Sequence, residues 1–300
     1  MDARANLLTG VALAVAVTAV SSSGPLVVFA AVPALAVAFW RNALAAGLLW
    51  PVAAVRHRDE LATLGAAGIA RSVVAGLALA VHFGTWMSAL TLTSVATATA
   101  LVCTQPVWAG LLAALLGRPL PRRAWLGIAV AVGGAALATG ADLTISHRAV
   151  LGDLLALAGG IAGAVYVTLG QRVRQHVSTT TYTAVCYGTC AVALLAACLI
   201  ARVPLSGYPA ASWLAIGLLT AGPQFLGHSL FNVTLRRLSA TAVSVIALLE
   251  VPGAALIAFL LVGQVPAAVT VPGMAILVAG VAVAVGGPRR QGSARPAAPP

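Results

Sequence analysis

Charged side chains are scarce in this 300-residue chain, and lysine is absent altogether. Only 8% of the residues are charged, whereas soluble domains carry about 25%, and 61% are hydrophobic with a mean hydropathy of +1.02. A soluble globular protein is therefore excluded. The lack of lysine also excludes a phosphate-binding loop of the G-x-x-x-x-G-K-[ST] kind, so we do not expect direct ATP hydrolysis.

Alternation of apolar and polar residues is also missing from the long apolar stretches, which are continuous and rich in Ala, Leu and Val. A transmembrane β-barrel shows that alternation over segments of about ten residues. Only helices and closed barrels satisfy their backbone hydrogen bonds inside lipid. The sequence therefore predicts an all-α integral membrane protein.

The net charge of +11 comes from arginine alone. The arginines lie in short connections between apolar runs, so we interpret them as topology signals with some attraction to anionic lipid. We expect the lipid bilayer as a partner and no nucleic acid. The bias toward Ala and Arg is typical of a GC-rich bacterial genome, which favours a bacterial cytoplasmic membrane.

Cysteines are few, and they form no framework. Cys186 and Cys190 share a helix face, so a metal or redox pair is one interpretation. No His or carboxylate is spaced nearby to complete such a site, and small apolar packing is the preferred interpretation. We predict no metal and no cofactor.

Ten apolar segments have the length of a membrane span, which is about 20 residues. They cover residues 7–30, 33–55, 64–88, 94–116, 122–140, 151–170, 180–201, 211–233, 239–262 and 267–286. The first segment resembles a signal peptide, but its long apolar stretch continues through Pro33 into the next span. We therefore interpret it as an uncleaved helix.

Arginine distribution supports this segmentation. With the N-terminus inside, the inner segments hold most of the arginines: Arg4, Arg56, Arg58, Arg118, Arg122, Arg123, Arg172, Arg174, Arg236, Arg237 and those of the tail. The outer connections hold only Arg148 and Arg202. This bias predicts that both termini are cytoplasmic. The basic tail, residues 288–300, is rich in Pro and Gly and is predicted to be disordered.

The two halves of the chain align when the sequence is shifted by 146 residues. His82 then meets His228, and Pro106 meets Pro252. Several glycines coincide in the same register: Gly76 with Gly222, Gly117 with Gly263, Gly127 with Gly273, Gly134 with Gly280 and Gly140 with Gly286. We predict two repeats, residues 1–145 and 146–287. Because each holds five spans, the second crosses the membrane in the opposite sense, which is an architecture of secondary transporters.

Long segments of both halves resemble the EamA-type family of the drug/metabolite transporter superfamily. They are TSVATATALVCTQPVWAGLLAALLGRPLPRRAWLGIAVAVGGAAL, SATAVSVIALLEVPGAALIAFLLVGQVPAAVTVPGMAILVAGVAV, and GDLLALAGGIAGAVYV at the start of the second repeat. Arg41 in FWRNALAAGLL is similar to the family's second-helix arginine. The resemblance implies a ten-helix bundle that moves small metabolites through a central cavity. Arg118 and Gln264 stand where the family often has Glu, and Glu250 is one residue further from Pro252 than in the family's Glu-Pro.

Arg41 and Glu250 are the ionisable groups predicted to lie deepest. They are ~12 Å and ~16 Å into their helices, near the middle of a hydrocarbon core about 30 Å thick. A charge there costs roughly 2.5–3.5 kcal/mol and usually faces a cavity or a partner. Two interpretations stay open, a structural salt bridge between the two residues and a substrate- or proton-linked role.

Gln224, His228 and Asn232 recur at i, i+4 and i+8, which places them on one face of an α-helix. This stripe predicts either a cavity wall or an interhelical hydrogen-bond seam. The first repeat has His82 and Trp86 at the corresponding positions. Trp86 has two open interpretations, as an aromatic cavity wall and as lipid-facing bulk.

Pro106 and Pro252 each remove a backbone hydrogen bond in the middle of a span. They are tolerated kinks, or they free carbonyl groups that line the cavity and bend as access alternates.

Together these patterns predict a secondary transporter for a small-molecule substrate, working by alternating access and in the direction of export. The alternatives are a channel or a non-transporting scaffold, with an intramembrane enzyme as a distant third. No catalytic residue is assigned, because the sequence has one deep carboxylate and no nucleophile–base set on facing helices. Coupling to protons and assembly as a homodimer stay open.

Overall fold

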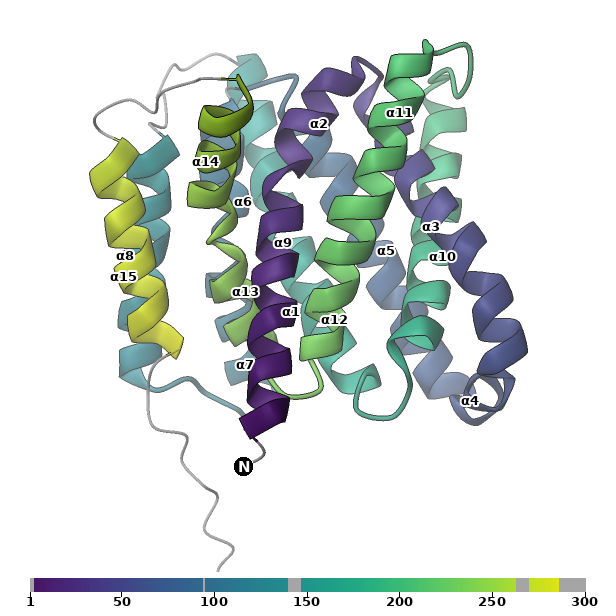
Figure 1. Cartoon of the computed structure of the whole chain (residues 1–300), viewed down its shortest axis with the longest axis horizontal. Coiled ribbons are helices and arrows are strands. Elements are labelled where there is room, and N and C mark those ends of the chain that lie inside the picture. The colour runs from purple at the N-terminus through teal and green to yellow at the C-terminus, as the bar shows by residue number, and fades with distance from the viewer. Residues whose placement is uncertain (1–2, 94, 140–146, 263–269, 286–300) are drawn as a thin grey trace, which may run out of the picture.

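The computed structural model describes residues 3–93, 95–139, 147–262 and 270–285, and every regular element within them is a helix. Figure 1 shows the helices standing side by side in one bundle. The elements are α1 (Ala3–Ser21), α2 (Ser23–Ala30), α3 (Ala34–Arg56), α4 (Arg58–Thr63), α5 (Gly65–Ala89), α6 (Val95–Val102), α7 (Gln105–Leu115), α8 (Arg122–Thr139), α9 (His147–Val173), α10 (Thr179–Ile200), α11 (Ala210–Leu219), the π-helix η1 (Thr220–Ser229), α12 (Leu230–Thr234), α13 (Ala240–Ala247), α14 (Glu250–Val262) and α15 (Thr270–Val285). The predicted all-α bundle is confirmed.

Seven helical segments among the described residues are long and apolar enough to cross a membrane. Two shorter helical segments, Ala100–Leu115 and Val271–Val285, are also apolar. With α8, which packs along α15, they account for the ten predicted spans. The short connecting helix α4 was not predicted. Gln264 and the tail, residues 288–300, lie outside the described residues.

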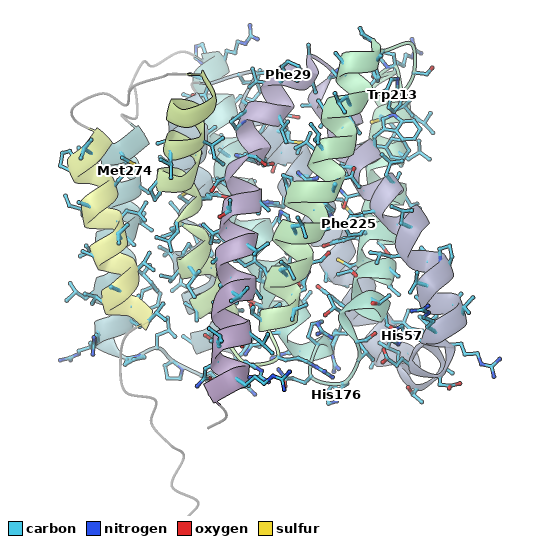
Figure 2. The ribbon with its side chains drawn as sticks, in the orientation of Figure 1. Phe29, His57, His176, Trp213, Phe225 and Met274 are labelled. Carbon is cyan, nitrogen blue, oxygen red and sulfur yellow. The ribbon has the colours of Figure 1, made fainter. Side chains whose placement is uncertain are left out.

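The connections between helices alternate between the two ends of the bundle. Figure 2 places His57 and His176 at the end where α1 begins, and Phe29 and Trp213 at the opposite end. We call the first end the N-terminal side. The last helix, α15, returns to that side, because Ala284 near its end packs against Gly127 near the start of α8.

Local sequence signals explain where several helices begin. Ser178 accepts a hydrogen bond from the backbone N–H of Thr181 at 3.2 Å, and Ser239 accepts one from Ala242 at 3.1 Å. Such serine caps satisfy an amide that has no partner inside the helix. They fix the starts of α10 and α13 on the N-terminal side.

Helices α8 and α15 cross with the reciprocity expected of a two-fold axis. A Cβ atom added at Gly134 would lie 2.3 Å from the backbone nitrogen of Leu277, and one at Gly280 would lie 2.3 Å from that of Ala131. Each of these residues is 146 positions from its counterpart. A second pair of contacts repeats the pattern: Gly127 with Ala284, and Gly273 with Ala138. Because equivalent residues exchange partners, as in an isologous interface, the two repeats are related by a pseudo-two-fold axis.

The fourth and ninth spans are interrupted at equivalent places. Helix α6 ends at Val102 and α7 begins at Gln105, while α13 ends at Ala247 and α14 begins at Glu250. Pro106 and Pro252 lie in the first turns of the second halves, where proline is tolerated because the first amides of a helix lack intrahelical partners. Both prolines thus follow a break in the middle of a span.

Two other spans depart from the predicted continuous α-helices. The first is divided at Ser22 into α1 and α2. The eighth contains the π-helix η1, whose sequence includes Pro223 between Gly222 and Gln224. A proline removes a backbone donor and favours a local change in the hydrogen-bond pattern. The prediction of a regular α-helix over residues 211–233 was therefore wrong for Thr220–Ser229.

Candidate functional site

A cavity of about 90 Å³ lies between the two repeats. About 10–15 Å³ of such volume is enough for one water molecule, so the cavity holds several waters or part of a small solute. Helices α5 and α7 contribute to its wall from the first repeat, and α9, η1, α12, α13 and α14 from the second. Five predicted site residues line it: His82, Trp86, His228, Asn232 and Glu250.

The two histidines that the repeat brings into register meet in this cavity. Their ring centroids are 6.4 Å apart with an interplanar angle of 68°. Nδ1 of His82 is 2.8 Å from the carbonyl oxygen of Gly159. Because a carbonyl only accepts, that nitrogen carries the hydrogen. Trp86 stacks beside His82 at 6.3 Å, and Phe83 meets the ring of His228 edge-on at 5.1 Å.

Two hydrogen-bonded pairs in the cavity wall include residues that the sequence patterns did not select. Asn232 donates from Nδ2 to the hydroxyl oxygen of Tyr166 at 2.6 Å. Gln105 donates from Nε2 to Oγ of Ser244 at 2.9 Å. The amide of Gln105, directly before Pro106 in an apolar span, was the available signal. These pairs hold neighbouring helices together and orient the polar groups of the wall.

Glu250 begins α14 and faces the cavity. The break before it creates a helix N-terminus inside the bundle, and a helix N-terminus stabilises negative charge. Among the residues that the structure describes, no hydrogen-bond donor or cation pairs with its carboxylate. A Cβ added at Gly253 would lie 2.2 Å from Oγ of Ser21, so glycine allows the first turn of α14 to lie against the end of α1.

Arg41 lies behind the cavity wall and is 0% exposed. Its Nε donates to Oε1 of Gln224 at 2.8 Å, one NH group is 3.5 Å from Oγ of Ser23, and the guanidinium is 4.3 Å from the ring centre of Phe83. No carboxylate of the described residues lies within salt-bridge distance of it. The alternative in which Arg41 and Glu250 form a salt bridge is therefore wrong. Instead, Arg41 is held against Gln224, Ser23 and the ring of Phe83, and its second NH2 group has no hydrogen-bond partner among the described residues.

Gln224 does not share the cavity face of His228 and Asn232. It is 0% exposed and also donates to Oδ1 of Asn42 at 3.1 Å. The predicted stripe assumed an α-helix, but η1 has the wider turn of a π-helix, which changes the direction of the side chain. Gln224 therefore connects η1 to α3, while the other two residues of the stripe face the cavity.

The kink residues Pro106 and Pro252 lie outside the cavity wall. The residues four positions before them, Val102 and Leu248, both line it. In a regular α-helix the carbonyls of these two residues would accept from the backbone N–H of residues 106 and 252, but proline has no N–H. The carbonyl of Leu248 instead accepts from the backbone N–H of Val251 at 3.1 Å.

At the N-terminal end of the cavity, side chains from the α9–α10 connection bind the backbone of α12 and the residue after it. Arg174 donates to the carbonyl of Asn232 at 3.0 Å, and Gln175 donates to that of Leu235 at 3.1 Å. Asn232 and Leu235 both line the cavity. Arg236 in turn donates to the carbonyl of Arg174 at 3.0 Å. These contacts, which we call the N-terminal latch, fasten the end of the cavity.

Glu60 in α4 joins the two repeats on the same side. Its carboxylate accepts from the backbone N–H of Ser178 at 2.8 Å and from the hydroxyl of Thr181 at 2.7 Å, and His57 lies 3.4 Å away. Burial acts to raise the pKa of Glu60, but the hydrogen bonds from Ser178 and Thr181 and the charge of His57 lower it to about 2. The carboxylate therefore caps α10 in its ionised form.

The described residues contain no group of three or more His, Cys, Asp or Glu side chains that could hold a metal ion. Cys186 and Cys190 are buried free thiols in α10, where they pack in the core shared by α3, α5 and α10.

This architecture, with two inverted five-helix repeats around a polar cavity, defines a multi-pass membrane protein of the transporter class. The model of the EamA-like transporter family matches residues 7–140 and 150–286. The chain therefore belongs to that family, within the drug/metabolite transporter superfamily, and it is a membrane transporter rather than an enzyme. This membership and the packing of α8 on α15 confirm the predicted fold class.

Two further comparisons bear on the chain. Among the solved structures that it resembles is a crystal structure with a TM-score of 0.75 and 20% sequence identity, covering 92% of this chain and 96% of the other. At that identity the likeness shows the fold alone. No curated protein matches the chain.

Proposed function

We propose that the protein is a secondary transporter that exports small organic metabolites or drugs by alternating access. The cavity at the interface of the inverted repeats carries this proposal, because substrate sites of such folds lie at that interface. The N-terminal latch closes one end of the cavity with side chain-to-backbone hydrogen bonds. Bonds of this kind, worth about 0.5–1.5 kcal/mol each, break and form readily during a transport cycle.

The orientation follows from the arginines. Most arginines of the connections lie at helix ends on the N-terminal side, including Arg56 at the end of α3, Arg172 near the end of α9 and Arg237 after α12. Arg148 at the start of α9 and Arg202 after α10 belong to the opposite side. Cytoplasmic loops carry such an excess. The proposal therefore places both termini in the cytoplasm of a bacterial cell, with the latch on the inner side of the cytoplasmic membrane.

The driving force is a solute or proton gradient, since the sequence offers no phosphate-binding loop. The imidazoles of His82 and His228 and the carboxylate of Glu250 line the cavity. They are the groups by which protons would be coupled to transport. Assembly as a homodimer is compatible with this scheme and is not required by it.

Counterflow in proteoliposomes of the purified protein tests the proposal. Vesicles are loaded with an unlabelled solute from a panel of organic amines, carboxylates and alcohols, and uptake of the labelled solute is followed with and without a pH gradient. A carrier gives saturable uptake that is accelerated by solute on the opposite side. Flux that rises linearly with concentration and shows no acceleration would instead identify a channel.

The cavity residues are tested in the same vesicles. Glu250→Gln and His228→Ala are expected to reduce counterflow at least about tenfold, because the first removes the carboxylate charge from the cavity wall and the second removes an imidazole from it. Asp59→Asn, at a 96% exposed side chain on α4, is the matched control and is expected to leave counterflow unchanged. Normal counterflow in both cavity variants, with normal insertion, would refute this site assignment.

A further inference from the structure

Among the described residues that line the cavity, Glu250 is the one that can offer a solute a negatively charged side chain. Arg41 is close to the cavity but does not line it. Its guanidinium is fully buried behind Phe83 and Ser23 and is bound to Gln224. A solute in the cavity therefore meets negative charge directly and positive charge only through intervening side chains.

Three neutral polar side chains of the wall donate hydrogen bonds within the protein, whereas Nε1 of Trp86 has no partner among the described residues. His82 donates to the carbonyl of Gly159, Asn232 donates to Tyr166, and Gln105 donates to Ser244. Glu250 differs, because the described residues offer its carboxylate no donor and no cation. A carboxylate withdrawn from bulk water is costly unless it is paired. The N-terminus of α14 offsets part of that cost, and a cationic ligand would complete the pairing.

Aromatic rings form another part of the same wall. Phe83, Trp86 and Tyr166 all line the cavity, and His82 stacks beside Trp86. The faces of such rings carry negative potential and attract organic cations, most strongly where water is excluded. Apolar ring surface also favours the hydrocarbon part of a ligand. A carboxylate and aromatic rings in one small cavity therefore favour a positively charged ligand.

We propose that the cavity binds small organic monocations, with the ammonium group of the ligand paired to Glu250 and its apolar part against the aromatic rings. The inference rests on the proposed carrier function for its transport role, but binding itself does not require that function. It names a substrate class for the cavity. It also explains why the carboxylate is present in one repeat only, where Thr104 occupies the equivalent position of the other, since one monocation needs one counter-charge.

The test compares three ligands that share a phenyl ring and differ in charge. They are N,N,N-trimethyl-2-phenylethylammonium, 2-phenylethanol and 3-phenylpropanoate, and binding to the detergent-purified full-length protein is measured by equilibrium dialysis. The permanent cation cannot release a proton, so it separates cation recognition from proton binding. The wild-type protein should bind the cation at least about tenfold more tightly than the alcohol, because charge-assisted contacts are roughly twice as strong as neutral ones.

Glu250→Gln should reduce this preference to about twofold or less, while Asp59→Asn should keep it. Equal binding of the cation and the alcohol, preference for the anion, absence of cation binding, or an unchanged preference in Glu250→Gln would each overturn the proposal. Counterflow distinguishes this failure from failure of the carrier function. Saturable counterflow of a neutral or anionic solute would leave the carrier intact, whereas cation binding without any counterflow would refute the carrier and not the cation site.

Discussion

Replacing Gly134 with valine should separate α8 from α15. An added Cβ at this position lies 2.3 Å from the backbone nitrogen of Leu277, and backbone cannot move aside as a flexible side chain does. Forcing extra atoms into a packed contact costs about 1–3 kcal/mol. With about 2–4 °C per kcal/mol for chains of 150–250 residues, the midpoint of thermal unfolding should fall by about 2–12 °C.

The neighbouring residue provides a matched control. Gly133 is exposed, and a Cβ added there meets no atom within 4 Å. Gly133→Val makes the same chemical change on the lipid-facing side, so its midpoint should stay within about 1 °C of the wild type. Gly280→Val should destabilise as much as Gly134→Val, because the two positions are equivalent across the pseudo-two-fold axis. Unfolding is followed by tryptophan fluorescence in detergent. Equal midpoints for the variants at positions 133 and 134 would refute this packing.

Three further predictions follow from other contacts. The folded pKa of Glu60, about 2, lies below its ordinary value of 4.5. The contribution of Glu60 to stability is therefore present above about pH 4.5 and is lost as the pH falls toward 2. Glu60→Gln should flatten the profile of thermal midpoint against pH in that window. Arg174→Ala should increase amide hydrogen exchange around Asn232, because it removes the 3.0 Å bond to that carbonyl. Gly163→Ala should reduce solute affinity about tenfold, because its Cβ, placed 2.5 Å from Oε1 of Gln105, would displace that flexible side chain into the cavity.

The sequence predicts those parts of the fold that depend on long apolar runs and on the internal repeat. The spans follow from hydropathy because each must cross the same hydrocarbon thickness. The meeting of His82 with His228 follows from the repeat, because a two-fold axis brings equivalent positions of the central helices together. The position of Glu250 at the cavity follows from the free-energy cost of a carboxylate inside an apolar span, since such a group usually faces a cavity.

Other parts of the site depend on helix geometry that hydropathy does not encode. Gln224 left the predicted stripe because η1 is a π-helix, and the i, i+4 pattern applies to α-helices. Tyr166 and Gln105 stand alone in apolar helices, so no periodicity revealed which of their faces meets the cavity. The sequence left open whether Arg41 pairs with Glu250, because depth along two helices does not determine the distance between them.

Accessibility of Cys103 tests alternating access most directly. Cys103 lines the cavity, and replacing Cys186, Cys190 and Cys198 with alanine leaves it as the reporter. A membrane-impermeant maleimide is added to one face of oriented proteoliposomes and, separately, to the other. If access alternates, Arg174→Ala weakens the N-terminal latch, speeds labelling from the N-terminal side and slows it from the opposite side. Faster labelling from both sides at once would indicate a continuous pore and contradict the account.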